Sequence, residues 1–213
     1  QWRADVTRLG LRVNYQGVGS TSGRTLFAQG QLDYAVSEIP YQPGESKPGF
    51  TFVYLPIVAG GTSVMYRVKG ANGQQITNLR MSSKLTAQIF TRKVTKWNDP
   101  RLAAENPGIT LPAKDILVVH RSDGSGTTYI FTDYLTAVSK PWADGPGKGK
   151  SVQWPVGLGG KGNEGVAGQV KQTPGAIGYV ELAYANQNKL PAAQIKNASG
   201  AYIAPSIETI TAA

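Results

Sequence analysis

A glycine-rich stretch between a predicted strand and a predicted helix has the residues of an anion site. Residues 116–119 are apolar and β-branched, which is typical of a buried strand. Residues 127–138 repeat apolar side chains at helical spacing. The first backbone N–H groups of a helix have no internal acceptor, and the helix dipole adds partial positive charge there. The junction at residues 120–127 could therefore hold a small anion.

Each polar residue of this junction can be given a role. Arg121 can offer a two-pronged donor to an oxyanion, and Asp123 can hold Arg121 in place by an ion pair. Ser125 and Thr127 add hydroxyl donors, and Gly126 lets the backbone approach a ligand closely. The alternative is structural: Asp123 or Ser125 caps the helix and Arg121 is a surface charge.

A second segment repeats the pattern near the start of the chain. Residues 11–16 alternate as a strand, residues 17–23 form a Gly/Ser loop, and residues 22–29 have helical spacing with Ser20 close to the helix start. Two such loops could grip one ligand from two sides. Both could equally be ordinary strand-to-helix turns of an α/β fold, which favour the same residues.

Further strands are predicted before residue 60. Residues 31–36 indicate a strand that ends just before Glu38, at the position where open α/β sheets bind ligands. Residues 50–59 form an apolar run typical of a buried strand. Residues 1–9 resemble the end of a helix that stops at Gly10.

The amino-acid composition excludes several kinds of functional site. The 213 residues contain no cysteine and one histidine, His120, so thiol catalysis and zinc–thiolate sites are excluded and a histidine-based metal site is disfavoured. We expect no metal and no cofactor. The formal charge of +9 favours anionic partners, but the basic residues are scattered, so no nucleic acid is expected as partner. No apolar run approaches the ~20 residues of a membrane helix, so we expect no transmembrane segment.

Several segments together resemble one family, the phosphate-binding receptor of bacterial phosphate ABC transporters, called PstS. These segments follow in the family's order and spacing: residues 15–20 (YQGVGS), 33–38 (DYAVSE), 96–99 (KWND), 121–127 (RSDGSGT), 154–165 (WPVGLGGKGNEG) and 174–181 (PGAIGYVE). The resemblance implies a type II periplasmic-binding-protein-like α/β fold, with two lobes around a ligand cleft. It also implies that residues 1–60 form a partial first lobe and residues 61–213 the second lobe. The resemblance further implies that this sequence lacks the family's first phosphate loop and its C-terminal segment.

The resemblance also implies the site. Ser20 would donate to phosphate from the first lobe, and Arg121, Ser125, Gly126 and Thr127 from the second, with Asp123 orienting Arg121. Glu38 stands where the family has an aspartate that accepts a hydrogen bond from the protonated phosphate. Glutamate is longer by one carbon–carbon bond of roughly 1.5 Å. The implied function is phosphate binding in ABC-type import, with no enzymatic activity, a transporter permease as partner and a periplasmic or extracellular, envelope-associated location.

Two other hypotheses stay open. The chain could be an interaction module of a larger envelope protein that binds polyanions or a protein partner, with weak or no phosphate binding. The +9 charge and the missing family segments motivate this alternative. A phosphoryl-transfer or hydrolytic enzyme is the other, suggested by Ser125 beside Arg121, but no general base or metal cluster is predicted nearby.

Overall fold

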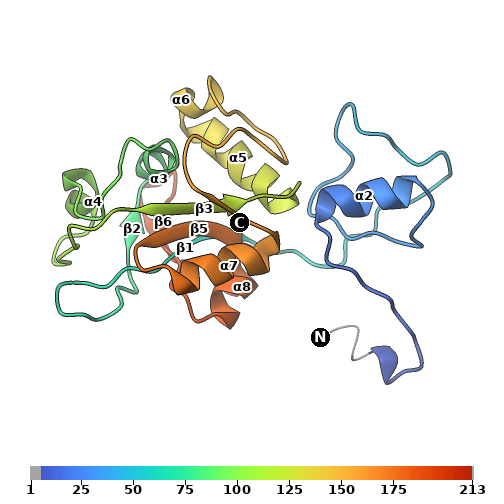
Figure 1. Cartoon of the computed structure of the whole chain (residues 1–213), viewed down its shortest axis with the longest axis horizontal. Coiled ribbons are helices and arrows are strands. Elements are labelled where there is room, and N and C mark those ends of the chain that lie inside the picture. Colours follow the sequence, from blue (N-terminus) through green and yellow to red (C-terminus); the bar gives the residue numbers. More distant parts are fainter. Residues whose placement is uncertain (1–5, 213) are drawn as a thin grey trace.

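The computed structural model describes residues 6–212, which form a sheet-and-helix body and an arm (Figure 1). The body begins at β1 (Thr62–Tyr66) and continues to the end of the described chain. The arm, residues 6–60, has only one labelled helix, α2 (Ser20–Ala28), and no strand. Figure 1 shows α2 and its loops beside the body, at the end of the sheet that carries the start of α5.

The main sheet of the body has four strands in the order β1-β5-β3-β4. Strands β5 (Ala176–Glu181), β3 (Leu117–Arg121) and β4 (Leu158–Gly160) are parallel, and β1 lies antiparallel to β5. The first five residues of β5 are buried, as expected for a strand covered on both faces. The parallel strands place their carboxyl ends at one edge, where β3 ends in Arg121.

Helices cover both faces of this sheet. On one face, α3 (Ser83–Phe90), α5 (Gly126–Val138) and α6 (Lys140–Ala143) share a core with the inward side chains of β1, β3 and β5. On the other face, α7 (Gly162–Gln172) and α8 (Leu182–Gln187) pack on the alternate residues of the same strands. Alternate side chains of each strand thus pack into two different cores, one on each face of the sheet. The two cores hold β3 and α5 in place.

The remaining elements complete the body away from the sheet edge. Strands β2 (Arg80–Met81), β6 (Gln194–Lys196) and β7 (Tyr202–Ile203) form a small second sheet, and α4 (Pro100–Glu105) begins at a proline after the capping Asp99. Near the end of the described chain, α9 (Ile207–Thr211) is a short helix. A reciprocal cap between Ser206 and Thr209 explains this helical turn.

The predicted strand at residues 116–119 and the predicted helices at residues 127–138 and 22–29 are confirmed as β3, α5 and α2, whereas the predicted strands of the arm are wrong. Residues 11–16, 31–36 and 50–59 are irregular. Val53, Leu55 and Val58 are 85%, 77% and 83% exposed, respectively. A strand is stable only as a member of a hydrogen-bonded ladder, and the described arm offers these segments no neighbouring strand. Of the predicted helix at residues 1–9, residues 1–5 lie outside the described range; Val6 and Thr7 are helical and Gly10 has a φ of 86°.

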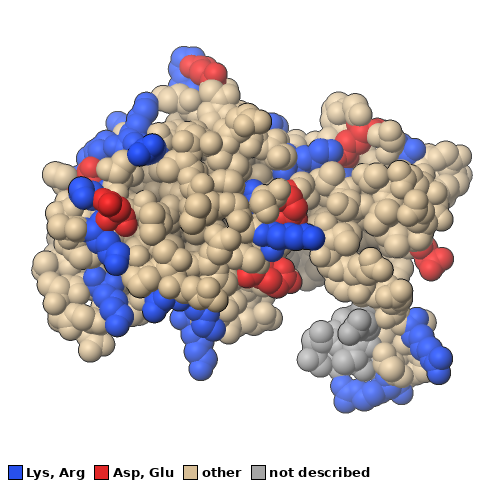
Figure 2. All heavy atoms as spheres, in the orientation of Figure 1, with Lys and Arg blue, Asp and Glu red and all other residues tan. Residues whose placement is uncertain are grey.

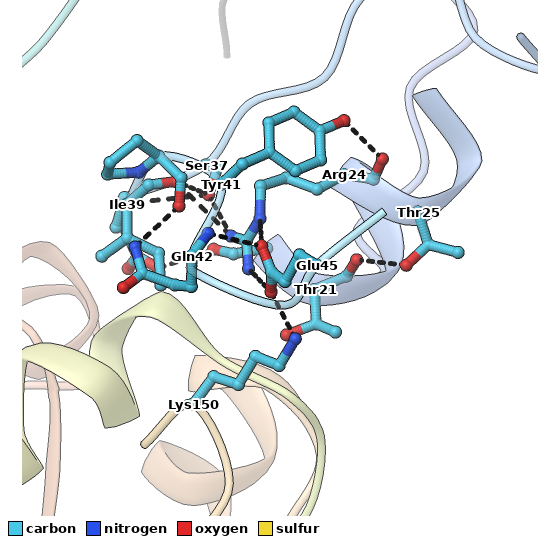
Figure 3. A network of polar contacts seen from close by, with 12 residues as sticks. Thr21, Arg24, Thr25, Ser37, Ile39, Tyr41, Gln42, Glu45 and Lys150 are labelled. Carbon is cyan, nitrogen blue, oxygen red and sulfur yellow. Dashed lines mark hydrogen bonds and ion pairs between the residues drawn. The ribbon is translucent and has the colours of Figure 1, made fainter. Parts of the chain in front are cut away.

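A polar network, and not a sheet, organises the arm and joins it to the body (Figure 3). The buried guanidinium of Arg24 in α2 donates to both carboxylate oxygens of Glu45, at 3.0 and 2.7 Å, and to the Ser37 hydroxyl at 2.7 Å. Lys150 of the body makes an ion pair with the same Glu45 carboxylate. The Gln42 N–H also donates to it, at 2.9 Å. Glu45 is therefore one of the residues through which the arm contacts the body.

The surrounding donors stabilise the negative charge of the Glu45 carboxylate. Burial raises the pKa of Glu45, but the hydrogen bonds from Arg24, Lys150 and the Gln42 N–H outweigh burial and lower the pKa to about 2. The carboxylate is therefore ionised throughout the neutral range. Its side chain is 13% exposed, so the interaction is less screened by solvent than a surface ion pair.

The core assignment predicts the effect of truncating α5. We expect Leu135→Ala to lower the free energy of unfolding by about 2–5 kcal/mol, because Leu135 is fully buried against the sheet. Ile130→Ala on the same helix removes a side chain that is 41% exposed and should change it by less than about 0.5 kcal/mol. Urea unfolding of the two variants makes the comparison. Equal losses would show that α5 does not pack as described.

The Glu45 network predicts a pH-dependent loss of stability. We expect Glu45→Gln to lower the free energy of unfolding at neutral pH by about 1 kcal/mol, after solvent screening is allowed for. Because the folded pKa of Glu45 lies below its ordinary value of 4.5, the wild-type advantage is complete above that value and disappears as pH falls to about 2. Urea unfolding at stepped pH measures it.

The control for this prediction is an exposed ion pair of the body. Asp115→Asn breaks the pair with Lys96, in which the two side chains are 72% and 57% exposed, and should leave stability unchanged at every pH. A difference between wild type and Glu45→Gln that stays constant down to pH 2 would refute the role given to the Glu45 carboxylate.

Candidate functional site

The strand–turn–helix junction predicted from the sequence is present. Arg121 is the last residue of β3, and α5 begins at Gly126. The Ser125 hydroxyl caps α5 by accepting a hydrogen bond from the Thr128 N–H at 3.1 Å. A hydroxyl that accepts one bond still carries its own hydrogen, so Ser125 can cap the helix and donate to a ligand at once. The structural alternative for Ser125 is thus compatible with the functional one.

Arg121 is fixed by Asp123, as predicted. Its Nε and Nη2 atoms donate to the two Asp123 carboxylate oxygens at 2.8 and 2.6 Å, and the Arg121 side chain is only 4% exposed. Burial lowers the pKa of Arg121, but the bonds to Asp123 raise it, and the net direction is upward. Burial raises the pKa of Asp123, and its bonds from Arg121 and from the Gly162 N–H lower it overall. Both groups therefore keep their charges near neutral pH.

A buried tyrosine connects the strand and the helix of this junction. The Tyr179 hydroxyl of β5 accepts the Arg121 N–H at 3.2 Å and shares a hydrogen bond of 2.7 Å with the Thr128 hydroxyl. Burial raises the pKa of Tyr179 to about 12, so the phenol stays protonated and can bridge strand and helix. The end of β3 and the start of α5 are therefore held by the same oxygen atom.

The first helix of the arm brings a second N-terminus to the same place. Ser20 is the first residue of α2, and the Thr21 N–H donates to the Gly124 carbonyl at 3.3 Å. Gly19 precedes α2 with a φ of 81°, and a Cβ there would lie 2.7 Å from an Asp123 carboxylate oxygen. Only glycine allows the arm to approach the Arg121–Asp123 pair so closely.

Glu38 lies between the two helix N-termini. Its carboxylate accepts the Ser20 hydroxyl at 2.9 Å on one oxygen and the Thr127 hydroxyl at 2.5 Å on the other. Gly126 lies directly against it, since a Cβ at Gly126 would be 2.4 Å from the first of these oxygens. The residue itself is exposed, so its side chain reaches in from the surface of the arm. The predicted strand before Glu38 is wrong, yet the side chain lies where the ligand site was expected.

The six predicted binding residues are therefore brought together from three segments of the chain. We call the donor groups of Ser20, Arg121, Ser125, Gly126 and Thr127 the anion cradle. It combines two helix N-termini, three hydroxyls and a buried guanidinium with the single carboxylate of Glu38, which suits a small, multiply charged oxyanion that also carries a proton. That these residues bind phosphate stays a prediction.

Sequence reasoning missed several supporting residues. The N-terminus of α7 helps to hold the ion pair: the Gly162 N–H donates to Asp123 at 3.0 Å, and Asn163 accepts from Arg121 at 3.4 Å. The available signal was a third strand, glycine turn and helix at residues 158–172. Tyr179, Arg24 and Glu45 gave no local signal, because their roles depend on distant partners.

Other candidate chemistry finds no support at this site. His120 stacks on Trp154, with ring centroids 4.8 Å apart, as an ordinary strand-end residue. Among residues 6–212, no group of three or more His, Asp or Glu side chains is placed to hold a metal ion. None of the helices in that range is both long and apolar enough to cross a membrane.

Comparison with known proteins supports the sequence resemblance. A family model described as a PBP superfamily domain matches residues 4–213. The chain is 44% identical, over all of its length, to "Phosphate-binding protein PstS" of Xylella fastidiosa and 45% identical, over 96% of its length, to the protein of that name in Haemophilus influenzae. It spans 58% and 60% of those two proteins, respectively.

Solved structures agree on the fold. A high-affinity periplasmic phosphate-binding protein (PfluDING), solved with phosphate, matches with a TM-score of 0.71 at 19% identity, over 94% of this chain and 60% of that one. A candidate phosphate ABC transporter substrate-binding protein from Clostridium perfringens, also solved with phosphate, matches with a TM-score of 0.68 at 17% identity, over 98% of this chain and 72% of that one. The predicted periplasmic-binding-protein-like α/β fold is thereby confirmed, and the chain belongs to the PBP superfamily, with PstS phosphate-binding proteins as its relatives.

Proposed function

We propose that this chain carries the phosphate site of a receptor for ABC-type phosphate import. The observation that supports this most is the convergence of Ser20, Glu38 and Thr127, from two helix N-termini and an arm loop, beside the buried Arg121. Phosphate would take donors from the whole anion cradle, with Asp123 holding Arg121 in position. The names of the PstS relatives point to the same ligand.

The carboxylate would provide selectivity. An ionised Glu38 has no proton to donate, so it can accept the O–H of HPO₄²⁻ or H₂PO₄⁻. Sulfate carries no proton near neutral pH and would leave two acceptors facing each other. A site that requires a ligand hydrogen can reject an analogue lacking it by about 10⁴.

The division into lobes follows from the same proposal. Residues 1–60 would belong to the first lobe and residues 61–213 to the second, with Gly60 and Gly61 at the junction. The partner would be an ABC transporter permease, and the location the periplasm or the outer face of the cell envelope. The chain would act as a receptor and not as an enzyme, because the Asp123 carboxylate is paired with Arg121 and the Glu38 carboxylate accepts two hydroxyl groups.

The polyanion alternative is weaker. On the face shown in Figure 2, Lys and Arg side chains are spread over the body, with acidic side chains among them, and do not form one continuous stripe. A net charge of +9 still favours weak, salt-sensitive attraction to polyanions. Polyanion binding that falls steeply with salt, together with no binding of free phosphate, would favour this alternative.

The proposal predicts selective phosphate binding that depends on Arg121. We expect calorimetric titration to show phosphate binding and much weaker sulfate binding. We expect Arg121→Ala to weaken phosphate binding by about 2–5 kcal/mol, which is at least roughly 30-fold, because a buried charge partner of the anion is removed. Arg121→Lys should also weaken it, since the lysine keeps the charge but loses the two-pronged geometry.

A surface variant and a test of folding serve as controls for this prediction. Arg101→Ala removes a guanidinium that pairs with Asp99 on the surface of the body and should leave phosphate affinity unchanged. Thermal melting of each variant identifies those that remain folded. Equal affinity for phosphate and sulfate in the wild type, or an unchanged phosphate affinity in a folded Arg121→Lys variant, would refute the proposed site.

A further inference from the structure

Glu38 uses the same donors that the proposed ligand needs. The Ser20 and Thr127 hydroxyls both donate to its carboxylate, at 2.9 and 2.5 Å. Gly126 at the start of α5 lies against the carboxylate with no room for a side chain between them. A carboxylate has the charge and the acceptor atoms of a small oxyanion. Glu38 therefore lies in the anion cradle as a tethered anion of the chain itself.

The surroundings allow the side chain to leave while its backbone stays in place. On one side, the Ser37 hydroxyl accepts from Arg24 at 2.7 Å and donates to the Ile39 carbonyl at 2.7 Å. On the other, Ile39 is buried. Glu38 itself is exposed and not held by core packing, so its side-chain torsions can move the carboxylate out of the anion cradle, and the cost is the loss of its two hydroxyl hydrogen bonds.

We propose that Glu38 is an internal competitor that phosphate must displace, and that its length, one methylene more than aspartate, is what lets it compete. This inference rests on the proposed phosphate site. When a binding-competent state is only partly populated, the apparent dissociation constant rises by the reciprocal of that population. Phosphate can offset the loss by donating its O–H to the displaced carboxylate. An oxyanion without a proton must displace Glu38 and obtains no hydrogen bond from it, so the same residue lowers affinity and raises selectivity.

Shortening the Glu38 side chain separates its role as competitor from its role as acceptor of the phosphate O–H. With the backbone fixed by Ser37 and Ile39, aspartate would withdraw the carboxylate by roughly 1.5 Å, so it could not reach both hydroxyls at once. It would remain an acceptor for a phosphate O–H. We therefore expect Glu38→Asp to bind phosphate about tenfold more tightly than the wild type in calorimetric titration. Glu208→Asp, which shortens an exposed glutamate on α9, should leave phosphate affinity unchanged.

Removing the charge tests the selectivity. Glu38→Gln keeps the shape of the side chain but is neutral, and its amide can donate to an oxyanion. We expect its affinity for sulfate to rise at least tenfold over the wild type, while the preference for phosphate over sulfate falls at least about 100-fold. Thermal melting with and without each anion provides a second readout, since the stabilisation of the folded state grows with the ratio of ligand concentration to dissociation constant.

The outcomes distinguish this inference from the proposed function. If the wild type binds phosphate and Glu38→Asp binds it equally or more weakly, Glu38 is not a competitor, although the phosphate site stands. An unchanged sulfate affinity in Glu38→Gln would likewise overturn the inference alone. Phosphate binding by Glu38→Asp but not by the wild type would support it in its strongest form. If neither wild type nor any variant binds phosphate, the proposed function fails and the inference fails with it.

Discussion

Two helix N-termini that face one another across a few ångströms need negative charge between them. The first N–H groups of α2 and α5 have no acceptor within their own helices, and the two helix dipoles both point their positive ends at the same volume. Arg121 adds a full positive charge nearby. Carboxylates or a bound anion stabilise this arrangement. Asp123 and Glu38 do so, and the geometry of the whole site follows from where these two carboxylates lie.

The two carboxylates are held differently. Asp123 is fixed in place, whereas Glu38 can move. Asp123 accepts from Arg121 through two parallel bonds and from the Gly162 N–H, in a half-buried position between β3 and α7. It acts as a fixed part of the body. Glu38 is held by two hydroxyls and is exposed. Hydroxyls reorient easily, and solvent can replace them as partners, so this carboxylate is the one that can move.

Sequence reasoning predicted the body well because its order is local. Strand alternation, a helix cap such as Ser125, and glycine turns act over a few residues, and the two cores reinforce them. The binding residues were found for a similar reason, since strand–glycine turn–helix junctions are readable locally. The arm was mispredicted because apolar alternation shows only that a segment could be a strand. Whether residues 50–59 become one depends on a neighbouring strand, which the described arm does not contain.

The position of Glu38 depends on contacts that form a ring around the site. Beginning at the capping Ser125, its N–H donates to the Lys150 carbonyl at 2.9 Å, and the Lys150 side chain pairs with Glu45. Figure 3 shows the next step, in which Glu45 holds Arg24 and Arg24 holds Ser37, the residue before Glu38.

The ring closes where Glu38 accepts from Thr127, two residues after Ser125. Every link is polar, and none requires a sheet in the arm. This explains how an arm whose apolar segments are largely exposed can still place one carboxylate against α5. It also means that the reach of the Glu38 side chain, measured from a backbone anchored through Ser37, is the quantity that decides which donors it can occupy.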